Sequence, residues 1–485
     1  MPGSSGLATG AIGASAPARS ALPPAALLAR WSLGFAAFAW YAAFSLNAAA
    51  RHLGGFDLAI FDQAIANLAH FRAPVSDIKG FDLFGDHFHP IIAIVAPCYR
   101  LYPHPGTLLV IQAAALGLSV VIVTKALQET LGAHSGFAMG FAYAISWGLQ
   151  SALYFGFHEV SLGVPIIAAV SARCLRREWS RAAVYAAFLL LVKEDLALTV
   201  AAFGVYLCIQ HAYRHGVALI ATSLVWLGLV VGVVIPLLNP YGRYLYWPGG
   251  APPQWTPGQP KLGLDADTLW SWQKVLTLVL LFAPMLFLAL RSWLAIVLVP
   301  TLAWRFLSAN PHYWGTKYHY SEILMPVAFL AGAAGLVGLL GARMAATRVR
   351  PERLTRAFAI AVVAVGLAIS VGFPFAKGVR PSYWGECTRC AAASAAVAQV
   401  PHGVSVAADD ALLPSLVDRD TVHVLAPALV DGLGEPLRPS YVVVDTMHTV
   451  QYSQPRWLAA LRAGVLSSDY TQVFSRDGYV VYRKH

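Results

Sequence analysis

Long apolar runs separated by short polar segments recur along most of the chain. Many run for about 18 to 22 residues, the length that a helix needs to cross roughly 30 Å of hydrocarbon. The pattern predicts an α-helical polytopic membrane protein in a cell membrane. About eleven transmembrane helices are expected, at residues 25–50, 107–126, 135–154, 159–175, 182–192, 196–212, 217–237, 271–290, 292–308, 321–341 and 357–375.

The two ends of this pattern differ from its middle. Residues 1–24 are rich in Gly, Ala, Ser and Pro, which predicts a disordered tail. The run at 25–50 is too long for the apolar core of a signal peptide, so it is interpreted as a retained first transmembrane helix.

One apolar stretch is interrupted by charge. Lys193, Glu194 and Asp195 lie in its middle, and three charges at the bilayer centre would be very costly. The sequence therefore predicts two short helices that meet at a turn near one face of the membrane.

Composition agrees with a membrane protein, and charge suggests its orientation. The chain is 58% hydrophobic and 12% charged, with a net charge of +10. It shows neither zinc-finger spacing nor a phosphate-binding glycine loop, so we expect no nucleic-acid partner. A cytoplasmic N-terminus satisfies the positive-inside rule, because it places these arginines in cytoplasmic segments: Arg173, Arg176, Arg177, Arg181, Arg214, Arg291, Arg343, Arg348, Arg350, Arg353 and Arg356.

With that orientation, three segments and the C-terminal part lie outside. The segments are a long first outer loop at 51–106, a second at 238–270 and a short third at 308–320. Residues 376–485 follow the last span of the 25–375 membrane domain and are expected to form a small extracytoplasmic α/β domain. Its strands are predicted at 403–408, 421–426, 440–445 and 479–483.

The only closely spaced cysteines are Cys387 and Cys390, in the sequence Cys-Thr-Arg-Cys. Such a pair can form a local disulfide, act as a redox pair or supply half of a metal site. Since no second CxxC exists, structural zinc is disfavoured and a stabilising disulfide is favoured.

The unusual polar residues all fall at the predicted outer ends of membrane segments. They come from five different loops, which is what an active site at the membrane surface would require. They are Asp57, Asp62, Asp86, His87, His89, His158, Glu159, Lys193, Glu194, Asp195, Arg243, His312, Lys317 and His319.

Each of these signals also has a simpler explanation. Asp57 could cap a helix after Gly54 and Gly55. Asp57 and Asp62 are five residues apart, about 140° around a helix, so one regular helix cannot aim both at one point. Lys193 could pair with a neighbouring acid or serve as a point charge for phosphate.

The segment Gly85 to Pro90, GDHFHP, has four possible roles. Its acid and two imidazoles could ligate a metal, exchange protons or bind phosphate. They could also form a polar turn before the apolar stretch that follows, since Pro90 breaks a helix.

Several motifs together resemble one known family. FDLAIFDQA, LFGDHFHP, FGFHE, LLLVKED and KYHY, in this order, are similar to a bacterial and archaeal family of polytopic membrane proteins. That family is grouped by fold with the GT-C glycosyltransferases, which include protein mannosyltransferases and lipid A aminoarabinose transferases. The resemblance covers about residues 30–450.

The resemblance implies a membrane glycosyltransferase that works on the extracytoplasmic face. It implies a polyprenyl-phosphate sugar as donor, and a glycan, lipid or protein of the envelope as acceptor. Asp57 is the first choice for the catalytic acid residue and Asp62 the second. The carboxylate would take a proton from the acceptor hydroxyl as the lipid phosphate leaves, with inversion at the sugar carbon.

The resemblance also implies groups for the phosphate and supporting acids. Phosphate-binding candidates are His87, His89, Lys193, Arg243, Lys317 and His319, and the supporting acids are Asp86, Glu159, Glu194 and Asp195. Some GT-C members use a divalent metal and others do not. Ligands for a metal could come from Asp57, Asp86, His87, His89 and Glu159. The sequence does not decide whether a metal is bound. The adjacent acidic pair that many members carry in the first outer loop is missing here.

Three other functions compete with this interpretation. A transporter would place polar groups near the bilayer midplane, often in repeated halves, and no repeat is visible. A non-enzymatic assembly or sensor protein would leave so many acids and imidazoles unexplained. Another lipid-linked transferase could use the same groups.

Overall fold

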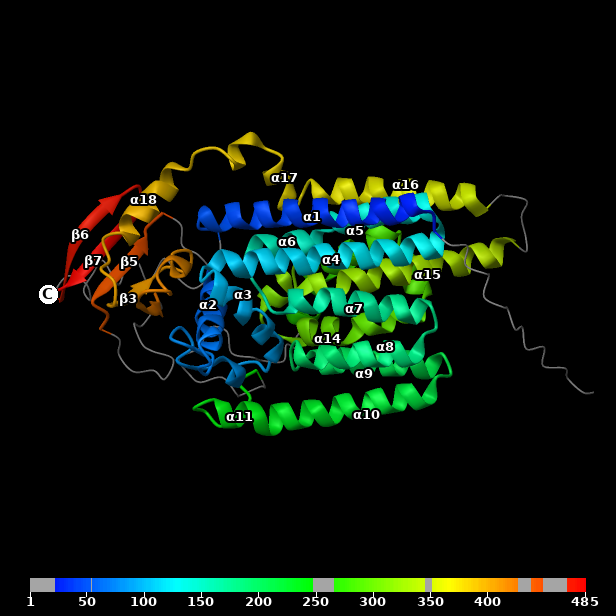
Figure 1. Ribbon diagram of the computed structural model, residues 1–485, viewed down its shortest axis with the longest axis horizontal. Helices are drawn as coiled ribbons and strands as arrows, with labels where there is room; N and C mark the ends of the chain where they lie inside the picture. The colour runs from blue at the N-terminus through cyan, green and yellow to red at the C-terminus, as the bar shows by residue number, and fades with distance from the viewer. Residues whose placement is uncertain (1–21, 54, 247–265, 345–350, 426–437, 448–468) are drawn as a thin grey trace, which may run out of the picture.

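The computed structural model describes residues 22–53, 55–246, 266–344, 351–425, 438–447 and 469–485. Figure 1 shows helices that run roughly parallel along the long axis, with an α/β unit at one end. Most of the tail predicted to be disordered, part of the second outer segment, and Arg348 and Arg350 lie outside the described residues.

Within the described residues, five helices are long and apolar enough to cross a membrane. Each coincides with a predicted span. Two of them combine elements: α10 (Tyr213–Leu229) continues through a π-helical turn into α11 (Ile235–Leu238), and the 3₁₀ helix η10 (His319–Leu324) leads into α15 (Met325–Met344). The others are α1 (Pro24–Ala50), α4 (Pro105–Leu131) and α16 (Pro351–Ser370).

Shorter helices occupy the remaining predicted spans. The prediction of several apolar helices is therefore confirmed, whereas the number of eleven crossings stays a prediction. The α-helices are α5 (Ala133–Ala144), α6 (Trp147–Phe155), α7 (Val160–Leu175), α8 (Trp179–Phe188), α9 (Leu196–Ile209), α13 (Trp272–Phe282) and α14 (Val299–Leu307). The 3₁₀ segments are η3 (Leu189–Leu191), η6 (Ala283–Met285), η7 (Leu288–Arg291) and η8 (Trp293–Leu298).

The chain turns between η3 and α9, where the three charges at 193–195 predicted a break.

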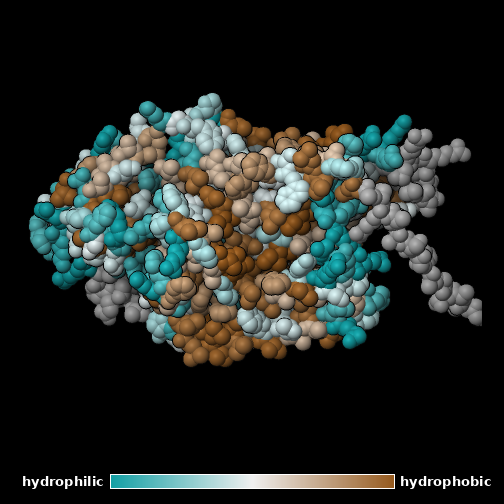
Figure 2. All heavy atoms as spheres, in the orientation of Figure 1, coloured by the Kyte–Doolittle hydropathy of each residue, from teal (hydrophilic) through white to brown (hydrophobic). Residues whose placement is uncertain are grey.

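Close helix packing elsewhere depends on small residues. A Cβ at Gly34 of α1 would lie 2.2 Å from Val121 Cγ2 of α4, so the two helices could not approach this closely with a larger residue. Figure 2 shows a band of hydrophobic residues across the middle of the visible face, with hydrophilic residues towards both ends.

The segment between α1 and α4 lies at the end of the bundle nearest the C-terminal sheet (Figure 1). Its longest element is α2 (Phe56–Ala69), whose first turn contains Asp57. Short elements follow: β1 (Val75–Ser76), β2 (Phe81–Asp82), η1 (Leu83–Gly85), η2 (Pro90–Ile94) and α3 (Ala96–Leu101).

The C-terminal part contains a five-stranded mixed sheet in the order β4-β3-β5-β7-β6. β3 pairs in parallel with β4 and β5, and β7 pairs antiparallel with β5 and β6. Helix α18 (Thr388–Val397) packs against β6 and β7. The strands are β3 (Ser405–Ala408), β4 (Thr421–Val424), β5 (Tyr441–Asp445), β6 (Tyr470–Arg476) and β7 (Tyr479–Lys484).

Two sequence interpretations of this part can be compared with the structure. All four predicted strands are present, and β6 is an additional strand at one edge of the sheet. Cys387 and Cys390 form a disulfide at the N-terminus of α18, as favoured from their spacing.

Candidate active site

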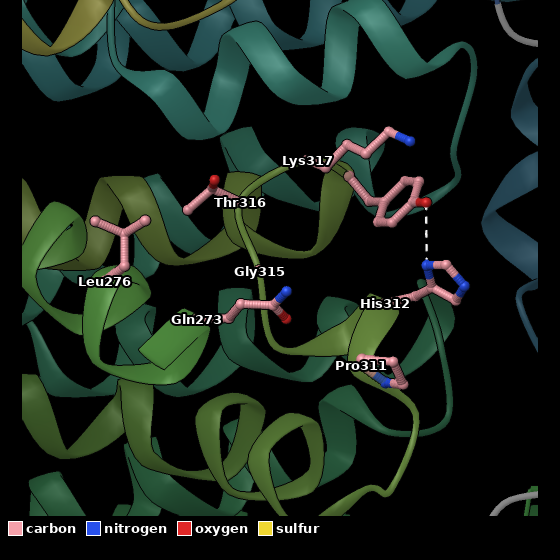
Figure 3. Close-up of a pocket in the computed structure, with 8 residues that line it drawn as sticks. Gln273, Leu276, Pro311, His312, Gly315, Thr316 and Lys317 are labelled. Carbon is pink, nitrogen blue, oxygen red and sulfur yellow. Dashed lines mark hydrogen bonds between the residues drawn. The ribbon is translucent and has the colours of Figure 1, made fainter. Parts of the chain in front are cut away.

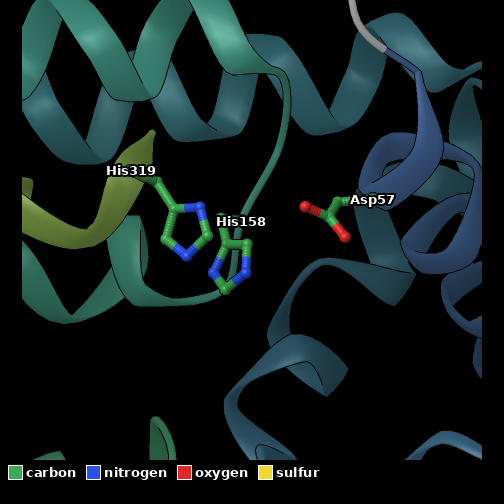
Figure 4. Close-up of side chains that lie close together, drawn as sticks. All are labelled: Asp57, His158 and His319. Atoms are coloured by element: carbon green, nitrogen blue, oxygen red, sulfur yellow. The ribbon is translucent and has the colours of Figure 1, made fainter. Parts of the chain in front are cut away.

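Three loops bring an acid and two imidazoles together at the end of the bundle that faces the C-terminal sheet. Asp57 comes from the first turn of α2, His158 precedes α7, and His319 begins η10. One oxygen or nitrogen atom of each lies within 4.8 Å of the other two. The two imidazole rings stack with centroids 3.4 Å apart, and Figure 4 shows the Asp57 carboxylate facing His158.

A buried ion pair adjoins this cluster. Glu159 Oε2 lies 2.7 Å from His158 Nδ1, and Glu159 Oε1 lies 3.2 Å from Lys193 Nζ. His89 Nδ1 is 3.8 Å from the same Oε1. Because Glu159 is fully buried, its carboxylate requires these nearby cationic and polar groups.

A second network joins the GDHFHP segment to the 193–195 turn. His87 Nδ1 lies 2.6 Å from Glu194 Oε1, and the Phe88 amide donates to Glu194 Oε2 at 3.0 Å. Asp86 Oδ2 lies 2.7 Å from Lys79 Nζ. Residues that are 107 positions apart in the chain therefore form one contiguous polar region.

Burial and nearby charges shift the pKa values of the acids in this region in different directions. Burial raises the pKa of the Asp57 carboxyl, against the opposing effects of His158, Lys79 and Lys193. Burial also raises the pKa of Asp195, to about 6. For Glu194, burial alone would raise the pKa, but the contacts with His87 and Lys193 hold it below its usual value. A carboxylate with a raised pKa is a stronger base near neutral pH, which favours Asp57 for proton transfer.

The imidazole of His89 is buried and lacks hydrogen bonds. It is 1% exposed, and neither ring nitrogen has a hydrogen-bond partner among the described residues. Burial lowers its pKa to about 4, so the ring is neutral at pH 7. The role of His89 as a phosphate contact stays a prediction.

The predicted residues thus divide into two groups. Nine of them lie in the connected polar region: Asp57, Asp86, His87, His89, Glu159, Lys193, Glu194, Asp195 and His319. The other three lie elsewhere. Asp62 is fully buried on α2 and faces Asp418 and Tyr99. Arg243 and Lys317 are exposed.

Lys317 instead lines a separate pocket of about 300 Å³ between α13 and the 311–318 segment. The walls are mostly apolar. Figure 3 shows Leu276 and Thr316 on one side of the pocket, and Lys317 and His312 on the other. Tyr318, whose hydroxyl lies 3.1 Å from His312 Nδ1, also lines it and is followed in the chain by His319. Lys193 is not among the lining residues, so the two lysines do not share this pocket.

Several contacts of the site were missed from the sequence. Lys79 pairs with Asp86, the Tyr244 hydroxyl donates to Glu194 at 2.9 Å, and the Tyr246 hydroxyl donates to Asp86 at 3.1 Å. Nothing in the local sequence marks the two tyrosines, because they lie 50 and 160 positions from their acids in the chain.

Arg305 was also missed, although it carried a signal. It is a charged residue inside a predicted membrane span, which marks a functional or structural role. Its buried guanidinium donates to the carbonyls of Tyr313 at 2.8 Å and Gly315 at 2.9 Å, and to Ser321 Oγ at 3.0 Å. It thereby fixes the segment that leads into His319.

Asp57, His158 and His319 are also residue types that bind divalent transition metals such as zinc. Of the ligands proposed from the sequence, only Asp57 belongs to this cluster. His158 and His319 are the residues that lie close enough to share an ion with Asp57, and the role of Asp86, His87, His89 and Glu159 as ligands stays a prediction.

A helical bundle with these loops and an α/β unit at one end defines a multi-pass membrane protein. The chain belongs to the family described as "Predicted membrane protein (DUF2079)", whose model matches residues 50–481. No curated protein matches it. The resemblance drawn from the motifs is thus confirmed for family and fold.

Two solved structures are similar along nearly their whole length. They are ArnT from Cupriavidus metallidurans bound to undecaprenyl phosphate and the same protein in the apo state, each with a TM-score of 0.54 and 13% identity. The match to the bound form covers 93% of this chain and 97% of that chain, and the match to the apo form covers 91% and 96%. At this identity the similarity concerns the fold.

Proposed function

We propose that this protein is a membrane glycosyltransferase that moves a sugar from a polyprenyl-phosphate donor to an envelope acceptor on the extracytoplasmic face. The observation that carries the proposal is the cluster of Asp57, His158 and His319 beside the Lys193–Glu159 pair, at one end of a GT-C-like bundle. A transporter would place such groups near the middle of the bundle.

Asp57 is the proposed base in this reaction. It is half-buried at the first turn of α2, where its raised pKa suits removal of a proton from an acceptor hydroxyl. Lys193 is the proposed partner of the leaving phosphate, since its side chain is 13% exposed and its ammonium reaches the same cluster through Glu159. Its charge would stabilise the phosphate as the bond to the sugar breaks.

The pocket beside Lys317 suits a part of the lipid donor. Its mostly apolar walls can accept an isoprenoid chain, and Lys317, His312 and Tyr318 can hold a phosphate at its rim. Tyr318 lines this pocket and directly precedes His319 of the cluster in the chain. One of the similar structures binds undecaprenyl phosphate, a lipid of this class.

The proposed orientation has a cytoplasmic N-terminus and an extracytoplasmic C-terminal domain, and a native cysteine tests it. Cys98 is free and exposed on α3, whereas Cys174 is buried. We expect a membrane-impermeant maleimide to label Cys98 in intact spheroplasts, and Cys98→Ser to remove the label. Labelling of Cys98 only after lysis would reverse the orientation.

The function itself is tested by the glycans of the cell envelope. Mass spectrometry of cells with and without this protein should show a glycan mass that depends on it. Purified protein with synthetic polyprenyl-phosphate sugars should then release polyprenyl phosphate in the presence of envelope extract. Repeating the reaction with a chelator tests metal dependence. Unchanged glycans and no phosphate release with any donor would refute the proposal.

A further inference from the structure

Helices α1 and α4 pack in opposite directions, and their register brings two cations to the same level. Gly34 of α1 packs closely on Val121 of α4. One turn further along this contact come Arg30 on α1 and Lys125 on α4. Beyond them, the Gln128 side chain donates to a carbonyl in the first turn of α1 at 3.3 Å. Contacts on both sides therefore hold Arg30 and Lys125 next to each other at the helix interface.

These two cations have no anion of their own. Within the described ranges, no hydrogen bond or ion pair joins Arg30 or Lys125 to another residue, and the Arg30 Nε is buried without an acceptor. The charges of Arg30, Arg173 and Arg176 all repel the Lys125 ammonium. Glu129 attracts it but is held by Arg176, whose Nε donates to Glu129 Oε2 at 2.8 Å. The group of cations therefore has room for a further negative charge.

Arg30 and Lys125 lie inside apolar helices and not at their ends. Arg30 is six residues from the start of α1 and Lys125 is six from the end of α4, about 9 Å along each axis. A charged group at this depth is costly unless it is paired. Figure 2 shows hydrophilic residues over the ends of α4 and α7 that lie away from the sheet, next to the apolar band.

An apolar track leads away from the two cations towards the middle of the bundle. Leu118 lies two turns before Lys125 on the same face of α4, and its side chain is 45% exposed. Ile122, between them on this face, is partly exposed. The surface thus has a positive end and an apolar stretch, which match the phosphate and the acyl chain of a lipid.

We propose that Arg30 and Lys125 bind the phosphate headgroup of an anionic membrane lipid, at the end of the bundle away from the C-terminal sheet. The Arg30 guanidinium can donate two hydrogen bonds to one phosphate, and the Lys125 ammonium adds a point charge. Basic pockets between transmembrane helices bind anionic headgroups in this way. The acyl chain lies along the face of α4 that carries Leu118. This binding is independent of the proposed glycosyl transfer.

The first test measures lipid binding to purified full-length protein by native mass spectrometry in a nonionic detergent. We expect the wild type to bind its first phosphatidylglycerol at least tenfold more tightly than phosphatidylcholine with the same acyl chains. Arg30→Gln and Lys125→Gln should each weaken phosphatidylglycerol binding about tenfold, which corresponds to the loss of one charge-assisted hydrogen bond. Equal affinity for the two lipids would overturn the proposal.

Arg214→Gln is the matched control for these substitutions. Arg214 is exposed at the start of α10, at the same end of the bundle, so the change removes the same charge from another place. It should leave the affinity for phosphatidylglycerol within a factor of two. An equal loss in the control would show that the lipid responds to net charge and that no site exists at Arg30 and Lys125.

A separate arm distinguishes a lipid from a free anion. Inorganic phosphate lacks the acyl chain, so at millimolar concentration we expect it to leave bound phosphatidylglycerol in place. Displacement of the lipid by inorganic phosphate at that concentration would mean that the site takes a free anion, and the lipid proposal would fail.

Charge reversal at Lys125 tests the site through stability. Lys125→Glu places a carboxylate at the level of Arg30, so repulsion becomes attraction. In nonionic detergent without lipid, its melting temperature should therefore exceed that of the wild type. Added phosphatidylglycerol should raise the melting temperature of the wild type and leave that of the variant unchanged. A variant that melts below the wild type without lipid, or that gains as much from the lipid, would refute the proposal.

Discussion

Replacing Asp57 by Asn should reduce glycosyl transfer by about 10² to 10⁴-fold, the usual contribution of a general base. The amide keeps the size of the side chain but cannot take a proton, so kcat should fall while the KM for the donor changes little. The measurement is release of polyprenyl phosphate by purified protein. The melting temperature of each variant in detergent is compared with that of the wild type, so that loss of folding is not taken for loss of catalysis.

Asp62→Asn is the matched control for this substitution. It makes the same chemical change on the same helix, but Asp62 faces Asp418 and Tyr99 instead of the histidine cluster. Turnover of Asp57→Asn within a factor of three of the wild type would exclude Asp57 as the base. A loss confined to Asp62→Asn would transfer the role to the other acid.

Replacing Arg305 by Ala should cost about 3 kcal/mol of stability or more, since each buried acceptor left without its partner costs roughly 1 to 3 kcal/mol. The carbonyls of Tyr313 and Gly315 and the hydroxyl of Ser321 would all lose their donor. We expect a lower melting temperature and faster proteolysis between residues 308 and 320. Transfer activity should fall as well, because His319 directly follows this segment.

Arg291→Ala provides the comparison, since Arg291 is exposed at the end of η7. Arg305→Lys should recover part of the stability, because an ammonium reaches fewer of the three acceptors than the planar guanidinium does. An unchanged melting temperature for Arg305→Ala would mean that water replaces the guanidinium.

Most of the helical fold could be predicted because it follows from the length and composition of each apolar run. The turn at 193–195 was also predictable, since the cost of burying its charges exceeds the gain from a continuous helix. Strand β6 was missed because most of its residues are exposed, so it lacks the apolar run of a central strand. The break between α5 and α6 was missed because no charge or proline marks it.

The candidate site was predictable as a region but not as a set of contacts. The ends of the predicted spans indicate which loops share one face, and this brings Asp57, Lys193 and His319 together. The stacking of His158 on His319 depends on the packing of α7 against η10, which leaves no trace in either local sequence. Asp62 carried the same local signal as Asp57, and only the helical angle between them predicted that they would point apart.

The packing of Ala59 into the core of the C-terminal domain has a consequence for biogenesis. Helix α2 leaves the ribosome more than 300 residues before β3, so it is made long before the strands that complete its surroundings exist. During that interval Ala59 lacks its partners from the C-terminal domain, and contacts this distant in the chain form slowly. With the proposed orientation and function, we expect activity to appear only after the C-terminal domain has been exported and has packed on α2.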